Sequence, residues 1–278
     1  MELLVQEQVW YGLFFATLLV ALSLYLGKRS QYWHLPSKPL AGKVSIPQTV
    51  GAFLLYIFLT IVLAPLIWIL IRGFLPDISS LSDYGRGWIQ VSAALFLFGF
   101  MCGYLFLQKQ EVQEEILGKF SWKSVGAGLG SLLLCYPFVF FLSVLGSIFS
   151  LLIWGEFELD QVAVVMVRKT IGHPGLFLAM VITVVFFVPI VEELLFRGFL
   201  QSVLRRYLGR SAAIILTAIF FALVHYAPSQ GTGNLQLLLS LFALSFFLCY
   251  VYEREQSLYA PITTHIAFNA LNVLFISI

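Results

Sequence analysis

Long apolar runs separated by short polar segments make up most of this chain. A membrane-spanning helix needs about 20 mostly apolar residues. The pattern predicts eight such helices, at residues 8–27, 49–71, 88–108, 126–154, 174–200, 211–228, 234–252 and 258–277. We therefore expect an all-α, multi-pass integral membrane protein in which residues 1–278 form a single membrane domain.

The composition supports this fold class. Of the 278 residues, 60% are hydrophobic and only 11% are charged, which is too few charges for a soluble domain. The formal net charge is +2, and the basic residues form no clustered stripe, so we expect no nucleic-acid partner.

The loops differ in their content of Lys and Arg, which predicts the orientation. Segments 28–48, 109–125, 205–210 and 253–257 hold four, three, three and one of these residues, or 11 of 16, and the alternate loops hold four. By the positive-inside rule the first set faces the cytoplasm and both termini face outward. Within the second segment, residues 109–129 mix charged and apolar positions. An amphipathic helix on the membrane surface and an ordinary solvated loop are both open there.

Ionisable side chains inside the predicted helices are confined to the fifth, sixth and eighth. They are Glu192, Glu193, Arg197, His225 and His265. A charge at the bilayer centre costs roughly 2.5–3.5 kcal/mol on insertion scales, so such groups seldom occur without partners. The three late helices are therefore expected to pack around one polar cavity.

Helical spacing separates the roles of the two glutamates. Glu193 and Arg197 are four residues apart and can form an ion pair on one face, which is also a sufficient structural reason for both. Glu192 points about 100° away and has no partner on its own helix, which suits a general base. Pro189 removes a backbone donor, so we expect the Val185 carbonyl to be free and the helix to kink beside Glu192.

The other two helices repeat the four-residue spacing. Phe221 and His225 share one face of a helix that Pro228 is expected to end, and His265 and Asn269 share one face of the last helix. Packing of polar groups between helices is an alternative reason for these pairs. Together with Glu192, however, they could hold and deprotonate a water molecule and stabilise an oxyanion, as amide hydrolysis requires.

Three motifs in this order resemble those of the CPBP family, also called the Abi or type II CAAX prenyl endopeptidase-like family. They are "EELLFR" (192–197), "FALVH" (221–225) and "HIAFN" (265–269), all within 174–278, whereas residues 1–173 show helices and loops without a motif. The resemblance implies an eight-helix intramembrane endopeptidase of the glutamic type that cleaves membrane-anchored or lipidated substrates.

The resemblance also implies residue roles. Glu192 and His225 would activate water, and His265 and Asn269 would form the oxyanion hole. The remaining motif residues Glu193, Arg197 and Phe221 would support the site. No cofactor is expected on this reading.

Other functions are compatible with the same residues. Glu192, His225 and His265 could form a zinc-binding set of two histidines and one glutamate. The chain could instead be a non-proteolytic scaffold or immunity factor of the same family, or a proton-coupled transporter. A bacterial plasma membrane is the default location, and a thylakoid or organelle membrane is also open.

The depth of the motif residues raises one difficulty for this assignment. Glu192 lies about 20 Å of helix from Arg205, whereas His265 lies early in the last helix. We therefore expect that residues 198–215 are not a simple spanning helix, and that their basic part projects from the membrane or lies on its surface.

Overall fold

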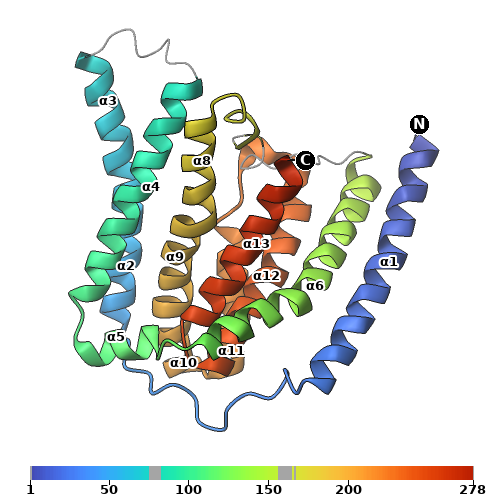
Figure 1. The fold of residues 1–278 in the computed structure, drawn as a ribbon, viewed down its shortest axis with the longest axis horizontal. Helices are drawn as coiled ribbons and strands as arrows, with labels where there is room; N and C mark the ends of the chain where they lie inside the picture. The colour runs from blue at the N-terminus through green and yellow to red at the C-terminus, as the bar shows by residue number, and fades with distance from the viewer. Residues whose placement is uncertain (1, 75–82, 156–164, 166, 278) are drawn as a thin grey trace.

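The computed structural model describes residues 2–74, 83–155, 165 and 167–277, and all regular structure in these residues is helical (Figure 1). The helices of the first half are α1 (Glu2–Arg29), α2 (Ile46–Ile57), η1 (Phe58–Leu63), α3 (Ala64–Phe74), α4 (Asp83–Phe106), α5 (Gln110–Leu117) and α6 (Trp122–Trp154). Those of the second half are α8 (Pro174–Ile182), η3 (Thr183–Phe187), α9 (Val188–Glu193), η4 (Leu194–Gln201), α10 (Ser202–Leu208), α11 (Arg210–Leu223), η5 (Pro228–Gln230), α12 (Gly233–Glu255) and α13 (Tyr259–Ser277). The all-α prediction is confirmed.

Six helical stretches among the described residues are long and apolar enough to cross a membrane. They are Val9–Arg29, Ile46–Ile67, Tyr84–Phe106, Trp122–Trp154, Pro174–Leu208 and Gly233–Glu255. The chain is therefore a multi-pass integral membrane protein. The other two predicted spans correspond to α11, with 14 residues, and α13, with 19 residues, so the count of eight stays a prediction.

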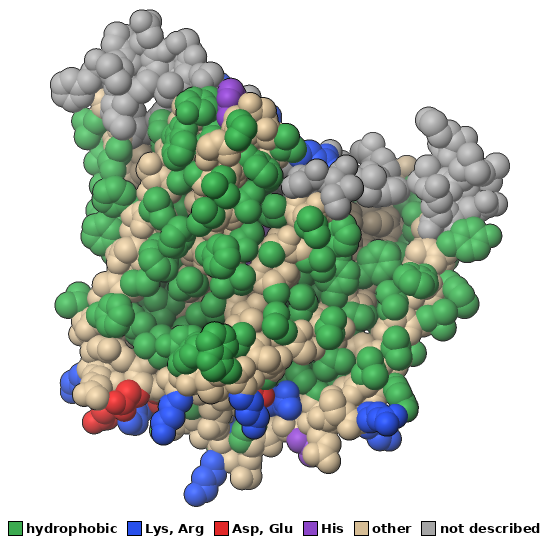
Figure 2. All heavy atoms as spheres, viewed as in Figure 1, with side chains coloured by type: hydrophobic (Ala, Val, Ile, Leu, Met, Phe, Trp, Pro, Cys, Tyr) green, Lys and Arg blue, Asp and Glu red, His purple; other side chains and the backbone are tan. Residues whose placement is uncertain are grey.

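Charged side chains gather at one end of the bundle, beyond a broad apolar belt (Figure 2). This basic end is formed by residues 30–45, α5, the turn between α10 and α11, and the turn between α12 and α13 (Figure 1). Both chain termini lie at the opposite end (Figure 1). The four segments rich in Lys and Arg thus share one side, as the charge pattern predicts.

Within the segment 109–129, residues 122–129 belong to α6, and residues 110–117 form the short helix α5 instead of an ordinary loop. Its apolar side chains Val112 and Ile116 are buried, and they pack against other helices of the protein. Gly198 on η4 permits this contact, because a Cβ there would lie 2.9 Å from Cγ2 of Ile116. The helix therefore closes the basic end of the bundle against η4.

One long helical run carries the first motif from one end of the bundle to the other. It runs through α8, η3, α9, η4 and α10, in which η3 and η4 are π-helical, and ends at Gly209 with φ +84°. The predicted span 174–200 is therefore too short. The expectation that residues 198–215 are not a simple spanning helix is wrong for residues 198–208, which continue the helical run to Leu208. The helix continues because Arg205 is buried and paired with carboxylates inside the protein instead of projecting into water.

Candidate active site

Glu193 and Arg197 form the buried centre of the site. Arg197 Nη1 lies 2.9 Å from Glu193 Oε1, and both side chains are fully buried. The guanidinium also donates to Ser245 Oγ of α12 at 2.6 Å and lies 4.7 Å from the ring centre of Phe221. The predicted pair exists, and it joins the long helical run to α11 and α12.

Glu193 also contacts the last helix, α13. The spacing of residues within one helix does not indicate this contact. His265 Nδ1 lies 2.7 Å from Glu193 Oε1. This contact brings the first and third motifs to one depth, so the expected difference in depth between them does not arise. Glu193 is therefore shared between a structural ion pair and a histidine of the candidate site.

Glu192 lies between the two motif histidines. Its Oε1 is 3.6 Å from His225 Nε2, and its Oε2 is 3.6 Å from His265 Nε2. These separations exceed a normal hydrogen bond. The side chains of Glu192 and His225 are 18% and 30% exposed, respectively, so this part of the site is accessible from outside the protein.

The hydrogen-bond partners of the histidines fix their tautomers. His225 Nδ1 lies 2.7 Å from the Phe221 carbonyl, which can only accept, so Nδ1 carries the proton. His265 Nδ1 faces the Glu193 carboxylate, which Arg197 already pairs, so it too is the donor. In the neutral rings both Nε2 atoms are then acceptors that face a third acceptor, Glu192.

His225 is placed by a turn and not by a helix. The predicted helix 211–228 ends at Leu223, and the His225 amide bonds to the carbonyl of Ala222 three residues earlier. The helix stops early because the His225 ring itself takes the Phe221 carbonyl, which an α-helix would leave to the backbone. Phe221 is fully buried and contacts the rings of both His225 and His265.

Asn234 holds the chain that follows His225. Its Oδ1 accepts from the Ala227 amide at 3.1 Å, and its Nδ2 donates to the Ala227 carbonyl at 2.7 Å and to the Gly231 carbonyl at 3.1 Å. Non-helical backbone at membrane depth must find such partners. The role of Asn234 was not predicted from the sequence. Its position seven residues after Ala227, at the Ala-Pro step, is the feature that could have indicated it.

Asn269 lies beside the interruption made by Pro189. In η3 the Val188 amide donates to the Thr183 carbonyl, five residues back. In that register the next donor would be Pro189, which has no N–H, and its acceptor would be the Val184 carbonyl. Asn269 Nδ2 donates to this carbonyl at 2.9 Å, so the carbonyl next to the interruption is Val184 and not Val185 as predicted.

Among the described ranges, no group of three or more His, Cys, Asp or Glu side chains is arranged to hold a metal ion. The zinc alternative would use Glu192, His225 and His265, and each histidine Nε2 lies 3.6 Å from a carboxylate oxygen of Glu192. Metal independence therefore stays a prediction, which the effect of a zinc chelator on cleavage can test.

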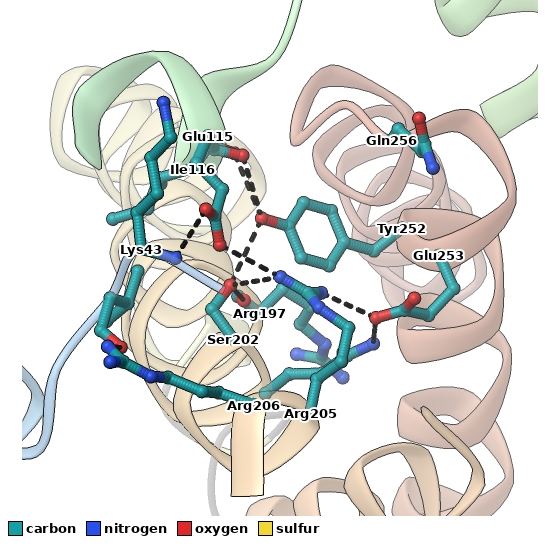
Figure 3. Close-up of polar contacts among 12 residues, drawn as sticks. Lys43, Glu115, Ile116, Arg197, Ser202, Arg205, Arg206, Tyr252, Glu253 and Gln256 are labelled. Atoms are coloured by element: carbon teal, nitrogen blue, oxygen red, sulfur yellow. Dashed lines mark hydrogen bonds and ion pairs between the residues drawn. The ribbon is translucent and has the colours of Figure 1, made fainter. Parts of the chain in front are cut away.

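A second buried polar cluster lies at the basic end (Figure 3). Arg205 pairs with Glu253 at 2.6 Å and with Glu115 at 3.2 Å, and Gln201 donates to Glu253 at 3.0 Å. We call Glu115, Gln201, Arg205 and Glu253 the Arg205 network. It joins α5, η4, α10 and α12, and its two glutamates lie in segments that were predicted as loops, 109–125 and 253–257.

A four-residue repeat could have revealed this network. Residues 197, 201 and 205 lie on one face of their helix, and their partners 245, 249 and 253 repeat the same step on α12. The constant offset of 48 residues shows two parallel helices packed in register. The polar stripe therefore continues from the candidate site to the basic end.

Comparison with known protein families gives a match within the second half of the chain. Residues 174–271 match the family described as type II CAAX prenyl endopeptidase Rce1-like. Neither the curated proteins nor the solved structures yield a match. This region is therefore an Rce1-like domain, consistent with the CPBP family that the three motifs predict, and the family supports a membrane protease that acts on membrane-associated substrates.

Proposed function

We propose that the chain is an intramembrane endopeptidase of the glutamic type, in which Glu192 and His225 activate water for hydrolysis of a peptide bond. The observation that carries this proposal is the convergence of three acceptors, Glu192 and the two Nε2 atoms, across gaps of 3.6 Å. Such a group requires a proton or a proton-donating molecule between its members. Water is the donor that hydrolysis needs.

The chemistry follows from the tautomers. A water molecule donates one proton toward Glu192 and the other toward His225 Nε2, which aims its oxygen lone pairs away from both. As the water oxygen bonds to the scissile carbonyl carbon, Glu192 takes the first proton and the carbonyl becomes an oxyanion. When the C–N bond breaks, protonated Glu192 returns that proton to the leaving nitrogen, so the products are a carboxylic acid and an amine.

The third motif is proposed to stabilise the oxyanion. Asn269 keeps one Nδ2–H besides the one that it donates to Val184, and His265 can donate from Nε2 when its ring is protonated. The Glu193–Arg197 pair holds the His265 ring so that Nε2 points toward Glu192. Glu193 and Arg197 are thus positioning residues.

The substrate is proposed to be a membrane-anchored or lipidated protein. The family name describes cleavage of prenylated CAAX sequences, and the candidate site lies within a span of the bundle. A substrate held in the bilayer by a lipid or a helix would reach this depth, whereas a freely dissolved peptide would have to leave water. The partial exposure of Glu192 and His225 leaves room for such an approach.

The test compares protein termini in cells that express the wild type or Glu192→Gln at matched levels. The matched control is Glu111→Gln, at a glutamate whose side chain is 75% exposed on α5. We expect new termini in the wild type and the control and none in Glu192→Gln. Identical termini in all three, with cell function retained, would overturn the proposal and favour a scaffold or immunity factor.

A further inference from the structure

Helix α2, outside the region matched by the family, packs in fixed register along the wall of the candidate site. Thr49 Oγ1 lies 3.3 Å from the Phe199 carbonyl, and the rings of Phe53 and Phe196 are 5.6 Å apart. The residue number rises along α2 as it falls along η4, so the two helices are antiparallel.

The next step of this register places Tyr56 beside Glu192. Positions 49, 53 and 56 lie on one face of α2, and three or four residues before Phe196 on the facing helix are Glu193 and Glu192. Tyr56 is half-buried and packs against the core cluster that includes Val191. Its phenol interacts electrostatically with Glu192, in agreement with the register.

The hydroxyl of Tyr56 has no hydrogen bond to any residue of the described part of the chain. Tyr104, on α4 against the same helix, differs because its hydroxyl donates to the Gln48 carbonyl at 2.8 Å. The half-buried Tyr56 therefore presents a free donor beside a site made of acceptors.

Among the motif residues, the oxyanion proposed above has one donor in the neutral site, the second Nδ2–H of Asn269. One Asn269 Nδ2–H is directed to Val184, and the Nδ1 proton of His265 is directed to Glu193. His265 Nε2 is an acceptor in the neutral ring. A phenol carries its proton at neutral pH, so it can donate without a prior protonation step.

We propose that Tyr56 is a further catalytic residue, whose O–H donates a hydrogen bond to the oxyanion that forms when water adds to the scissile carbonyl. The phenol keeps its proton throughout, so the proton balance through Glu192 is unchanged. This inference rests on the proposed function. It also places a catalytic residue within residues 1–173, the part of the chain that carries none of the three motifs.

The experiment measures kcat and KM of the full chain on the peptide sequence whose cleavage the comparison of termini identifies. Tyr56→Phe removes only the hydroxyl. We expect kcat to fall about 100- to 1,000-fold with KM within about twofold, as for the loss of one oxyanion donor. The control Tyr104→Phe removes the hydroxyl bound to Gln48 and is expected to keep kcat while lowering the unfolding temperature slightly.

Three results would overturn the inference, and they can be told apart. If Tyr56→Phe keeps the wild-type kcat while Glu192→Gln is inactive, Tyr56 has no catalytic role and the proposed function stands. If Tyr56→Phe and Tyr104→Phe lower activity and unfolding temperature alike, the role of Tyr56 is structural. If Glu192→Gln gives the same termini as the wild type, the proposed function and this inference fall together.

Discussion

Two buried polar clusters lie on the same long helical run and differ in how their charges are satisfied. In the Arg205 network, Arg205 lies 2.6 and 3.2 Å from two carboxylates, and the side chains are at most 3% exposed. Around Glu192 the nearest partners are two histidine nitrogens at 3.6 Å, and the glutamate is 18% exposed. Burial and charge are common to both, whereas the carboxylates of the Arg205 network pair directly with a cation and Glu192 lies between two histidines beside an opening.

The difference shows how a structural cluster can be told from a reactive one. Buried ions paired at hydrogen-bond distance hold helices in register but leave no group free to exchange a proton. A carboxylate that no cation pairs directly keeps its basicity available for a molecule that enters. Glu193 belongs to both kinds, since one oxygen contacts Arg197 and His265.

The largest expected effect breaks the structural cluster. Arg205→Met should destabilise the folded protein by about 3–5 kcal/mol, because Glu115 loses its buried counter-charge and Glu253 keeps Arg210 at 3.4 Å but loses the closer Arg205. Thermal unfolding in detergent measures the change, and cleavage per folded molecule should stay near the wild-type value. Arg206→Met, at an exposed neighbour, is the control. Equal stability of the two variants would contradict the account of the network.

His225→Gln tests the reactive cluster. Glutamine has no lone-pair nitrogen for water, so we expect kcat to fall about 100-fold, equivalent to about 2.7 kcal/mol in the barrier. Its unfolding temperature should stay close to that of the wild type because His225 is part-exposed. A large loss of stability with normal kcat would make His225 a structural residue like those of the Arg205 network.

Asn234→Ala should affect both stability and rate to a smaller degree. The Ala227 amide loses its partner, and the carbonyls of Ala227 and Gly231 each lose one of two hydrogen bonds, at a cost of about 1–3 kcal/mol. We also expect a kcat reduction of less than 10-fold, because His225 is displaced and not removed. Hydrogen exchange of residues 226–232 should rise in this variant, and unchanged exchange would contradict the role of Asn234 in holding the turn.

Chelation should have the smallest effect. If Glu192 and His225 activate water without a metal, a strong zinc chelator leaves cleavage by the purified protein unchanged within about twofold. Loss of activity that zinc restores would favour the zinc alternative.

The sequence predicted the membrane fold and the residues that surround Glu192, because ionisable groups are rare in apolar helices and their spacing is regular. It did not predict that Glu193 bonds to His265, since contacts between helices leave no mark on spacing within one. The Arg205 network was missed because Glu253 directly follows an apolar run and resembles a loop charge. The π-helical segments and the early end of α11 depend on side chains that replace backbone partners, which hydropathy does not register.

The most direct test measures unfolding temperature and cleavage of Glu192→Gln in the same purified sample as the wild type. The account predicts an unfolding temperature equal to or above that of the wild type, because the substitution removes a buried carboxylate that no cation pairs directly. It also predicts that cleavage falls by roughly 100- to 10,000-fold, as for the loss of a general base. A lower unfolding temperature with cleavage retained would show that Glu192 is structural and contradict the central claim.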